Sequence, residues 1–227
     1  MTPKKIEPLD VPAYSVAAVA RWVGVPPTTL HKWVYGRDYL AGGRVRHWKR
    51  LIEPADGERG LLSFANVAEA HILDAFRKYR IPMPDIRSAI DMAQRAQPGA
   101  SHPLLTGGFF KRGKYLLVEH LSEKIAASKP IEGQPLLSDL DIRLDRIEID
   151  DRGKSMRLFP LRRNESKTVV LNSGVAGGQP IIAGTGILVE YVQDLHNVGL
   201  SPKKIAEQYG LDESKIVEAI KYIARAA

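Results

Sequence analysis

Residues 14–39, YSVAAVARWVGVPPTTLHKWVYGRDY, carry the clearest structural signal in this 227-residue chain. The first half places apolar residues at i, i+3, i+4 and i+7 of one helical stripe, and these residues are Val16, Val19, Ala20 and Val23. Ser15 precedes the stripe as an N-cap, and Gly24 follows it as a residue that tolerates a left-handed backbone. Pro26 and Pro27 end this helix and begin another, because proline at the opening position loses no hydrogen bond. The segment therefore predicts two short helices joined by a tight turn, a helix-turn-helix.

The second predicted helix has an apolar face and a polar face. Leu30, Trp33 and Val34 share the apolar face, so the remaining side chains point elsewhere and are able to bond to phosphates or base edges. The predicted DNA-contacting residues are Thr28, Thr29, His31, Lys32, Tyr35, Arg37, Arg44, Arg46 and Lys49. We expect Thr29, His31 and Lys32 near base edges, and the residues from Tyr35 onward on phosphates. The alternative is a helical hairpin that packs inside a core.

Charge favours the interpretation as a DNA-binding surface. Residues 21–50 contain seven basic residues and one acid, Asp38, which gives a local net charge of +6. The whole chain has a net charge of +7 and a pI near 9.5, which favours an anionic partner. Residues 177–227 carry five basic against six acidic groups and are not a promising nucleic-acid surface. If about six phosphates are neutralised, the log-log salt slope of binding to B-DNA should be roughly −5.

The segment after the helix pair predicts a wing and two longer helices. Within residues 44–64, RVRHWKRLIEPADGERGLLSF, we expect a short strand around Val45, a turn at Asp56-Gly57 and a return strand at residues 61–62. Ser63 is the expected cap of a long helix that reaches residue 79. A further helix follows residue 84 and ends near Gln97, because Pro98-Gly99 cannot continue it.

This first region resembles a known family of DNA-binding domains. The order and spacing of VGVPPTTLHKW, LIEPADGERGLLSF and RIPMPDIRSAI are similar to those of MerR-like winged helix-turn-helix domains, over about residues 12–97. The resemblance implies a recognition helix in the major groove and a wing beside it. Typical MerR regulators continue into one long dimerisation helix, whereas Pro98, Gly99 and Pro103 interrupt that path in this chain.

The middle of the chain predicts a small β-rich region. KYLLVEHL, residues 114–121, indicates a strand, and residues 146–161 predict a hairpin whose Ile147 and Ile149 alternate with charged residues. The hairpin turns at residues 150–153 and returns through Met156 and Leu158. Residues 168–171, TVVL, are a third β-type run.

The last fifty residues predict three helices. Ser201 and Asp212 are expected N-caps of the second and third helices, and Gly210 is expected to end the second. The preceding GGQPIIAGTG, residues 177–186, followed by these helices, resembles the module called domain of unknown function 433. Members of that family commonly have arginine after Gly-Thr, where this chain has Gly186.

The conjunction of these three parts resembles VapB-type antitoxins of bacterial toxin-antitoxin pairs. That resemblance implies a protein that neutralises a PIN-like ribonuclease toxin and binds operator DNA to repress its own operon. A homodimer on a near-palindromic site is expected from symmetry. The alternative function is a MerR-like regulator that answers a small molecule held in the β-rich middle and has no toxin partner.

The sequence predicts an α+β protein that is mainly helical, in three parts. These are a DNA-binding domain at residues 1–97, a linker and β-rich middle at 98–175, and a three-helix partner-binding or dimerisation module at 176–227. The absence of cysteine excludes disulfides and Cys-ligated zinc, and it favours a reducing cytoplasm. No window approaches the roughly 20 apolar residues of a membrane span.

We expect no enzymatic activity, no cofactor and no metal site. A metal-nuclease hypothesis would use the acidic run Asp139, Asp141, Asp145, Glu148, Asp150 and Asp151. Glu148 belongs instead to the solvated face of a predicted strand, and the last two aspartates occupy a predicted turn. The glycine-rich residues 177–186 lack the ending of a phosphate-binding loop, and the six histidines show no paired metal spacing.

Overall fold

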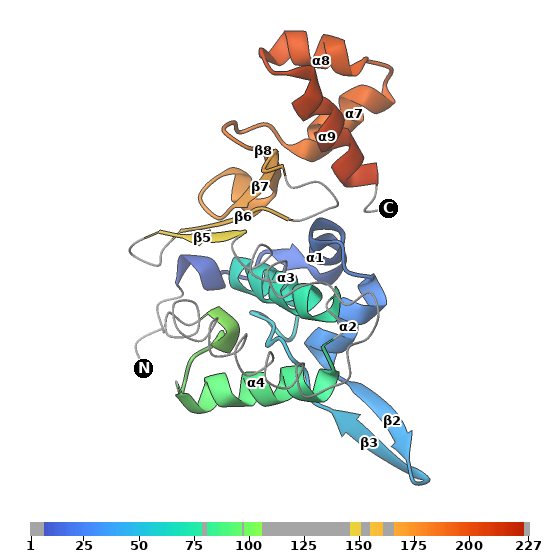
Figure 1. Ribbon diagram of the computed structural model, residues 1–227, viewed down its shortest axis with the longest axis vertical. Coiled ribbons are helices and arrows are strands. Elements are labelled where there is room, and N and C mark those ends of the chain that lie inside the picture. Colours follow the sequence, from blue (N-terminus) through green and yellow to red (C-terminus); the bar gives the residue numbers. More distant parts are fainter. Residues whose placement is uncertain are drawn as a thin grey trace.

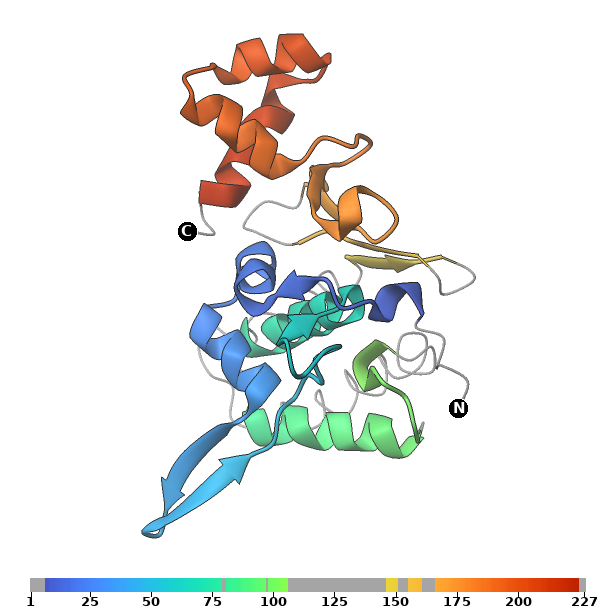
Figure 2. The ribbon, with the colours of Figure 1, turned by 180° about the vertical axis from the view of Figure 1, so that it is seen from behind.

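The computed structural model describes residues 7–78, 81–96, 98–105, 146–150, 155–160 and 166–224. Within these ranges the chain forms seven α-helices and three small antiparallel sheets, so the predicted α+β class is confirmed (Figure 1). The helices fall into a head, α1 to α4 within residues 12–96, and a tail, α7 to α9 within residues 189–224. A four-stranded sheet lies between head and tail in both views (Figure 2).

The predicted helix-turn-helix is present, with α1 at Val16–Val23 and α2 at Pro27–Tyr35. The Ser15 hydroxyl accepts a hydrogen bond from the Ala18 N–H at 3.2 Å, as an N-cap does. Gly24 adopts a left-handed conformation with φ 73° and ψ 31°, which turns the chain between the helices.

The wing lies earlier in the chain than the sequence pattern predicts. Strands β2 at Arg37–Ala41 and β3 at Arg44–Trp48 form a hairpin around Gly42 and Gly43, whose φ values are 59° and 72°. Two consecutive positive φ values define the tight turn that glycine favours between two antiparallel strands. The expected return strand β4, Leu61–Leu62, pairs instead with β1, Tyr14–Ser15. The predicted wing boundaries were therefore wrong, although Asp56 does begin a local turn that Leu61 closes.

Helix α3, Phe64–Lys78, is the central helix of the head. Its start is fixed by a reciprocal pair, because Ser63 Oγ accepts from the Asn66 N–H and Asn66 Oδ1 accepts from the Ser63 N–H. Nearly every side chain of α3 is buried, and Glu69 and Asp74 are among them. Helix α4, Met83–Ala96, and two short 3-10 helices, η1 at Pro8–Asp10 and η2 at Pro103–Leu105, complete this region.

The sheet is an antiparallel meander in the order β5-β6-β7-β8. Its strands are β5 at Ile147–Ile149, β6 at Met156–Leu158, β7 at Val169–Asn172 and β8 at Pro180–Ile182, with 3-10 helix η4 at Ala176–Gly178. The predicted hairpin and third β-type run are thus confirmed. The predicted strand at 114–121, the turn residues 151–153 and Asp139, Asp141 and Asp145 lie outside the described residues.

The tail contains the three predicted helices, α7 at Val189–Asn197, α8 at Pro202–Tyr209 and α9 at Glu213–Ala224. Ser201 Oγ accepts from the Lys204 N–H, and Gly210 ends α8 with φ 63°. The tail has its own apolar core, to which Val169 and Ile182 of the sheet contribute. Among the described helices, none is long and apolar enough to cross a membrane.

Polar contacts join the tail and its sheet to the head, and strands β5, β6 and β7 also contribute apolar side chains to the core of the head. The Tyr222 hydroxyl of α9 donates to the Trp22 carbonyl oxygen of α1 at 2.5 Å, and Arg21 pairs with Glu190 of α7 at 2.9 Å. The Tyr14 hydroxyl donates to the Gly177 carbonyl oxygen at 2.8 Å. The tail therefore docks on the first helix of the pair, while the β2-β3 hairpin projects from the opposite end of the molecule (Figure 1).

Candidate nucleic-acid interface

The predicted recognition helix presents its polar face to solvent. Leu30, Trp33 and Val34 of α2 are buried in the head core, as expected. The other five predicted residues of this helix lie on its outer side, where Thr29 is half-buried and Thr28, His31, Lys32 and Tyr35 are exposed. The His31 and Tyr35 rings are in contact, with centroids 4.5 Å apart. Hydroxyl, imidazole and ammonium groups are thus available along one accessible helix face.

The hairpin beside α2 has two chemically different faces, because side chains alternate along a strand. Arg37 pairs with Trp48, Tyr39 with Arg46, and residue 41 with Arg44, so these positions share the first face. We call it the cationic face, and on it the Arg37 guanidinium lies 4.3 Å from the Trp48 ring centroid. The opposite face carries the pair Leu40 and Val45 and an ion pair at 2.7 Å between Asp38 and His47.

The ion pairs reduce the basic excess that the sequence indicated. Arg21 faces the tail and bonds to Glu190, and Arg50 pairs with Glu53 at 2.7 Å. No ion pair within the described part of the chain neutralises the other five cations of residues 21–50, which are Lys32, Arg37, Arg44, Arg46 and Lys49. All five belong to the predicted DNA-contacting set, and all five are exposed. The accessible positive charge therefore lies on α2 and the hairpin rather than on α1.

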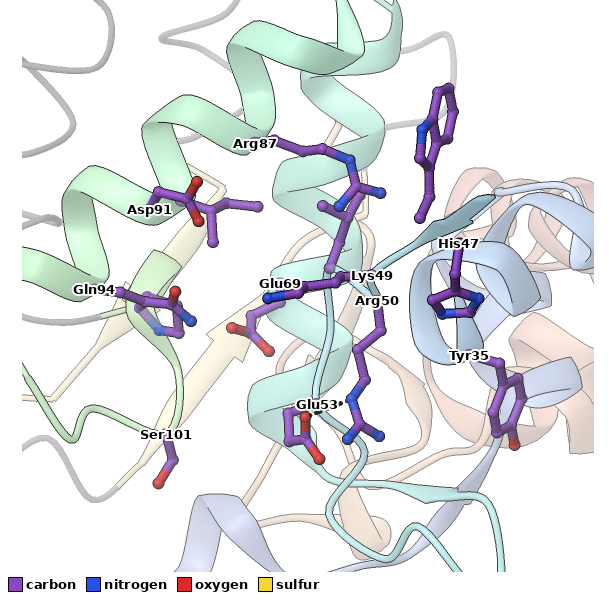
Figure 3. Close-up of a pocket in the computed structure, with 14 residues that line it drawn as sticks. Tyr35, His47, Lys49, Arg50, Glu53, Glu69, Arg87, Asp91, Gln94 and Ser101 are labelled. Atoms are coloured by element: carbon purple, nitrogen blue, oxygen red, sulfur yellow. Dashed lines mark ion pairs between the residues drawn. The ribbon is translucent and has the colours of Figure 1, made fainter. Parts of the chain in front are cut away.

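An open cleft of about 830 Å³ lies between the base of the hairpin, α3 and α4 (Figure 3). Lys49, Arg87 and Glu69 are turned toward its interior, and the Arg50–Glu53 pair lies at its edge. Burial lowers the pKa of Arg87, and the charge of Arg37 lowers it further, while Asp91 opposes both effects. Sequence reasoning missed Arg87, because only the fold brings α4 to within 5.7 Å of the Trp48 ring.

A buried polar network lies behind this cleft. Glu69 Oε2 accepts a hydrogen bond from Asn66 Nδ2 at 3.1 Å and lies 3.0 Å from His102 Nδ1, while His102 Nε2 lies 3.0 Å from an Asp10 oxygen. Burial raises the pKa of Glu69, although His102 and Asn66 oppose this effect. Burial alone would lower the pKa of His102, but the hydrogen bonds and charges of Glu69 and Asp10 raise it above the ordinary value. The network joins α3 to η1 and to the residue that precedes η2.

The acidic and glycine-rich segments considered for catalysis or phosphate binding have structural roles in the part of the chain that the structure describes. Glu148 pairs with Arg157 at 2.9 Å and with Lys167 at 2.6 Å across the sheet, as a solvated strand face does. The glycine-rich residues 177–186 run from η4 through strand β8, and a Cβ on Gly178 would collide with the Tyr14 hydroxyl. Within the described ranges, no group of three or more His, Cys, Asp or Glu side chains is arranged to hold a metal ion.

Comparisons with known proteins match both ends of the chain. Residues 12–90 match a family model described as a putative DNA-binding HTH domain, and residues 169–223 match one described as protein of unknown function, DUF433. Along its length the chain is 28% identical to the protein named putative antitoxin VapB45 of Mycobacterium tuberculosis, over 230 residues and 95% of each chain. The two family matches and the full-length relative agree with the order of parts predicted from the sequence.

The fold has a counterpart in a solved structure. The crystal structure of Rv2018 from Mycobacterium tuberculosis covers 93% of this chain and 99% of its own, with a TM-score of 0.67 and 23% identity. The likeness extends over head, sheet and tail and concerns the fold alone. The resemblance predicted from the sequence is confirmed: the chain matches a model of a putative DNA-binding helix-turn-helix domain near one end and a DUF433 model near the other. It is similar over nearly its whole length to a protein named putative antitoxin VapB45.

Proposed function

We propose that this protein is the antitoxin of a type II toxin-antitoxin pair. It binds a PIN-like ribonuclease toxin and neutralises it, and it binds operator DNA to repress its own operon in the cytoplasm. It catalyses no reaction itself. One observation carries the DNA-binding part. Five exposed cations on α2, on the hairpin and directly after it have no ion pair within the described part of the chain, and they lie beside the exposed polar face of α2.

The geometry of the head supports a proposed mode of DNA binding. Helix α2 enters a major groove with Thr29, His31 and Lys32 toward base edges, while the cationic face of the hairpin and Lys49 contact phosphates. Two copies of the chain bind a near-palindromic operator. The predicted divisions at residues 1–97, 98–175 and 176–227 remain part of this proposal.

The DNA part is tested by titrating the protein against its own promoter at several salt concentrations. Four neutralised phosphates per head, contacted by Arg37, Arg44, Arg46 and Lys49, give an expected log-log slope of about −3.6 for one head on B-DNA. A duplex of equal length and shuffled sequence is the control, and we expect it to bind more weakly with a similar slope. A flat salt response, or equal binding to both duplexes, contradicts operator recognition.

The toxin part rests on the end of the molecule away from the hairpin. Tyr191 and Val198 of the tail region are exposed apolar side chains, 46% and 75% accessible, on a surface of near-neutral charge. Protein partners favour such surfaces over charged ones. The test is to co-express the chain with the product of the adjacent reading frame. We expect rescue of growth and a stable complex that survives gel filtration, and we expect neither from a chain truncated before β7.

The cleft at the base of the hairpin favours a second candidate function, a ligand-responsive transcription regulator without a toxin. A small molecule bound there would contact Lys49 and Tyr35, which belong to the predicted DNA-contacting set. The two functions differ in what the operon encodes. A neighbouring gene for a growth-inhibiting ribonuclease supports the antitoxin, whereas operator release by a metabolite in the absence of such a gene supports the regulator.

A further inference from the structure

The tip of the hairpin carries an apolar pair that the head does not bury. Leu40 of β2 lies directly opposite Val45 of β3, so both side chains stand together on the face opposite the cationic one. Leu40 is 77% exposed and Val45 is 70% exposed, although each is bulky and apolar. The proposed contacts of α2 and of the cationic face use neither residue.

The apolar face is continuous with the end of α2. His47 lies on this face, and a Cβ on Gly36, the C-cap of α2, would collide with the His47 ring. Asp38 holds the same ring at 2.7 Å, so the base of the hairpin is fixed against the helix end. A duplex seated on α2 therefore runs on toward the hairpin, whose tip extends well beyond the helix (Figure 2).

We propose that Leu40 and Val45 form an apolar wedge that enters the minor groove of the bound duplex and partly unstacks a base step there. This proposal rests on the proposed DNA binding and adds a second mode of contact to it. Apolar side chains that enter a minor groove between base steps kink DNA, and flanking cations hold the phosphates on either side. The kink gives the protein sequence preference at a step that no polar side chain reads.

The composition of the tip favours nucleic acid over a protein partner. Arg44 and Arg46 flank Val45, and no acid occurs from residue 39 to residue 52. Gly42 and Gly43 carry no side chains, and a Cβ at either would meet nothing within 4 Å, so the tip is slim. Two side chains are also far too few for a stable protein interface, which uses about 20 residues on each side. One or two are enough for a wedge.

The test compares two double variants of the full-length chain. Leu40→Thr/Val45→Thr removes the apolar surface but keeps residues that favour strands. Arg44→Gln/Arg46→Gln removes two charges from the cationic face and leaves the wedge. Each protein is titrated against promoter duplexes that carry 2-aminopurine at successive steps, because this base fluoresces more strongly when it is unstacked. Tryptophan fluorescence and circular dichroism establish that both variants are folded.

The two variants should fail in different ways. The threonine variant should bind at least about tenfold more weakly, a loss of about 1.4 kcal/mol, with an unchanged salt slope and no 2-aminopurine signal. The glutamine variant should keep the signal in the bound state and lose about 2 from the magnitude of the slope. A threonine variant that keeps the wild-type affinity and the 2-aminopurine signal overturns the wedge but not the DNA binding. A threonine variant that binds DNA normally but no longer self-associates assigns Leu40 and Val45 to a protein interface, and this outcome also overturns the wedge. A wild-type protein without salt-dependent binding overturns the DNA function, and the wedge with it.

Discussion

The head and the tail each contain a helix pair built by the same local rules. Helices α1 and α8 both have eight residues, a serine N-cap and a left-handed glycine at the C-cap. In both, the residue after that glycine bonds back to an alanine carbonyl at 3.0 Å, as Val25 does to Ala20 and Leu211 does to Ala206. Three residues then separate each first helix from the second, α2 or α9.

The two pairs differ in what surrounds the second helix. Helix α2 is followed by a cationic hairpin, and its polar face is exposed. Helix α9 carries Glu213, Glu218, Lys215 and Lys221, and its Tyr222 is buried against α1 of the head. Local geometry therefore makes a helix-turn-helix, whereas net charge and access determine whether it is suited to read DNA. Substitutions at matched positions of the two pairs can test that distinction.

The largest expected effect is a loss of stability in the core of the head or of the tail that leaves the other core nearly unchanged. Leu30 of α2 and Ile216 of α9 are both fully buried, in different apolar clusters. Truncation of either to alanine should lower the free energy of unfolding by about 2–5 kcal/mol. All three tryptophans lie in the head, so tryptophan fluorescence in urea reports the head alone, and far-UV circular dichroism reports both. Leu30→Ala should shift the tryptophan transition and weaken promoter binding, whereas Ile216→Ala should leave both nearly unchanged.

An equal shift of the tryptophan transition by Ile216→Ala would mean that head and tail unfold as one unit. The head and the tail would then differ in their surfaces but would not be independent in stability. Tyr222→Phe distinguishes the two cases, because it removes the hydroxyl group that donates to the Trp22 carbonyl oxygen. In a single cooperative unit it should cost about 1 kcal/mol in the tryptophan transition.

The next effect compares one lysine from each second helix. Lys32 of α2 and Lys221 of α9 are both exposed. Lys32→Ala should reduce promoter affinity by about tenfold and narrow the preference for the promoter over the shuffled duplex, because a contact proposed at a base edge is lost. Lys221→Ala should change neither quantity. Equal losses from both variants would show that overall charge, rather than the α2 surface, governs binding.

A smaller loss of stability should result from replacing the C-cap glycine by alanine, and it should be the same in both helix pairs. Gly24 and Gly210 have φ values of 73° and 63°, where an alanine side chain is strained by about 1–2 kcal/mol. Alanine also stiffens the unfolded chain and recovers part of that cost, so we expect each substitution to destabilise by about 1 kcal/mol. Chemical denaturation followed by circular dichroism measures it. A clearly unequal pair of values would show that the two C-caps are not equivalent despite their matching geometry.

The parts of the fold that could be predicted from sequence are those set by neighbouring residues. Ser15, Gly24, Ser201 and Gly210 act within one helical turn, so their roles were predictable. The hairpin was misplaced because neither of its faces joins the head core, and the alternation of apolar and polar residues that identifies a half-buried strand is weak there. Its one strong signal was the glycine pair at residues 42–43.

The contacts between distant segments left no pattern in the sequence. Arg21 belongs to the basic excess of residues 21–50, but Glu190 partly neutralises it. Because Glu190 lies 169 residues away in the sequence, local spacing could not reveal this ion pair. Tyr222 and Trp22 are 200 residues apart. The nine predicted DNA-contacting residues share an accessible region of the head, but their roles at base edges or phosphates remain predictions, because no nucleic acid contact can be deduced from local spacing.

The smallest expected effect is a difference in pH dependence between the regions. In the head, the pKa values of Glu69 and His102 are raised in the folded state, so the folded protein holds more protons than the unfolded one. The contribution of these two groups to head stability should therefore be greatest at low pH and fall as the pH rises through the raised values, with the His102 part above about 6.5. Near the tail, hydrogen bonds from Ser166 and Thr168 lower the pKa of Glu218, so that contribution is lost as the pH falls below about 4.5.

Urea unfolding of the head, followed by tryptophan fluorescence between pH 6 and pH 8, measures the His102 contribution. His102→Gln keeps a group that can hydrogen-bond to Glu69 but does not titrate, so it should flatten the dependence above pH 6.5. Glu218→Gln is the matched variant for the tail, and it should leave this profile unchanged because Glu218 bonds to Ser166 rather than to the head. Head stability that rises from pH 6 to pH 8 in the wild-type protein would contradict a raised His102 pKa, since it requires a His102 that loses its proton on folding.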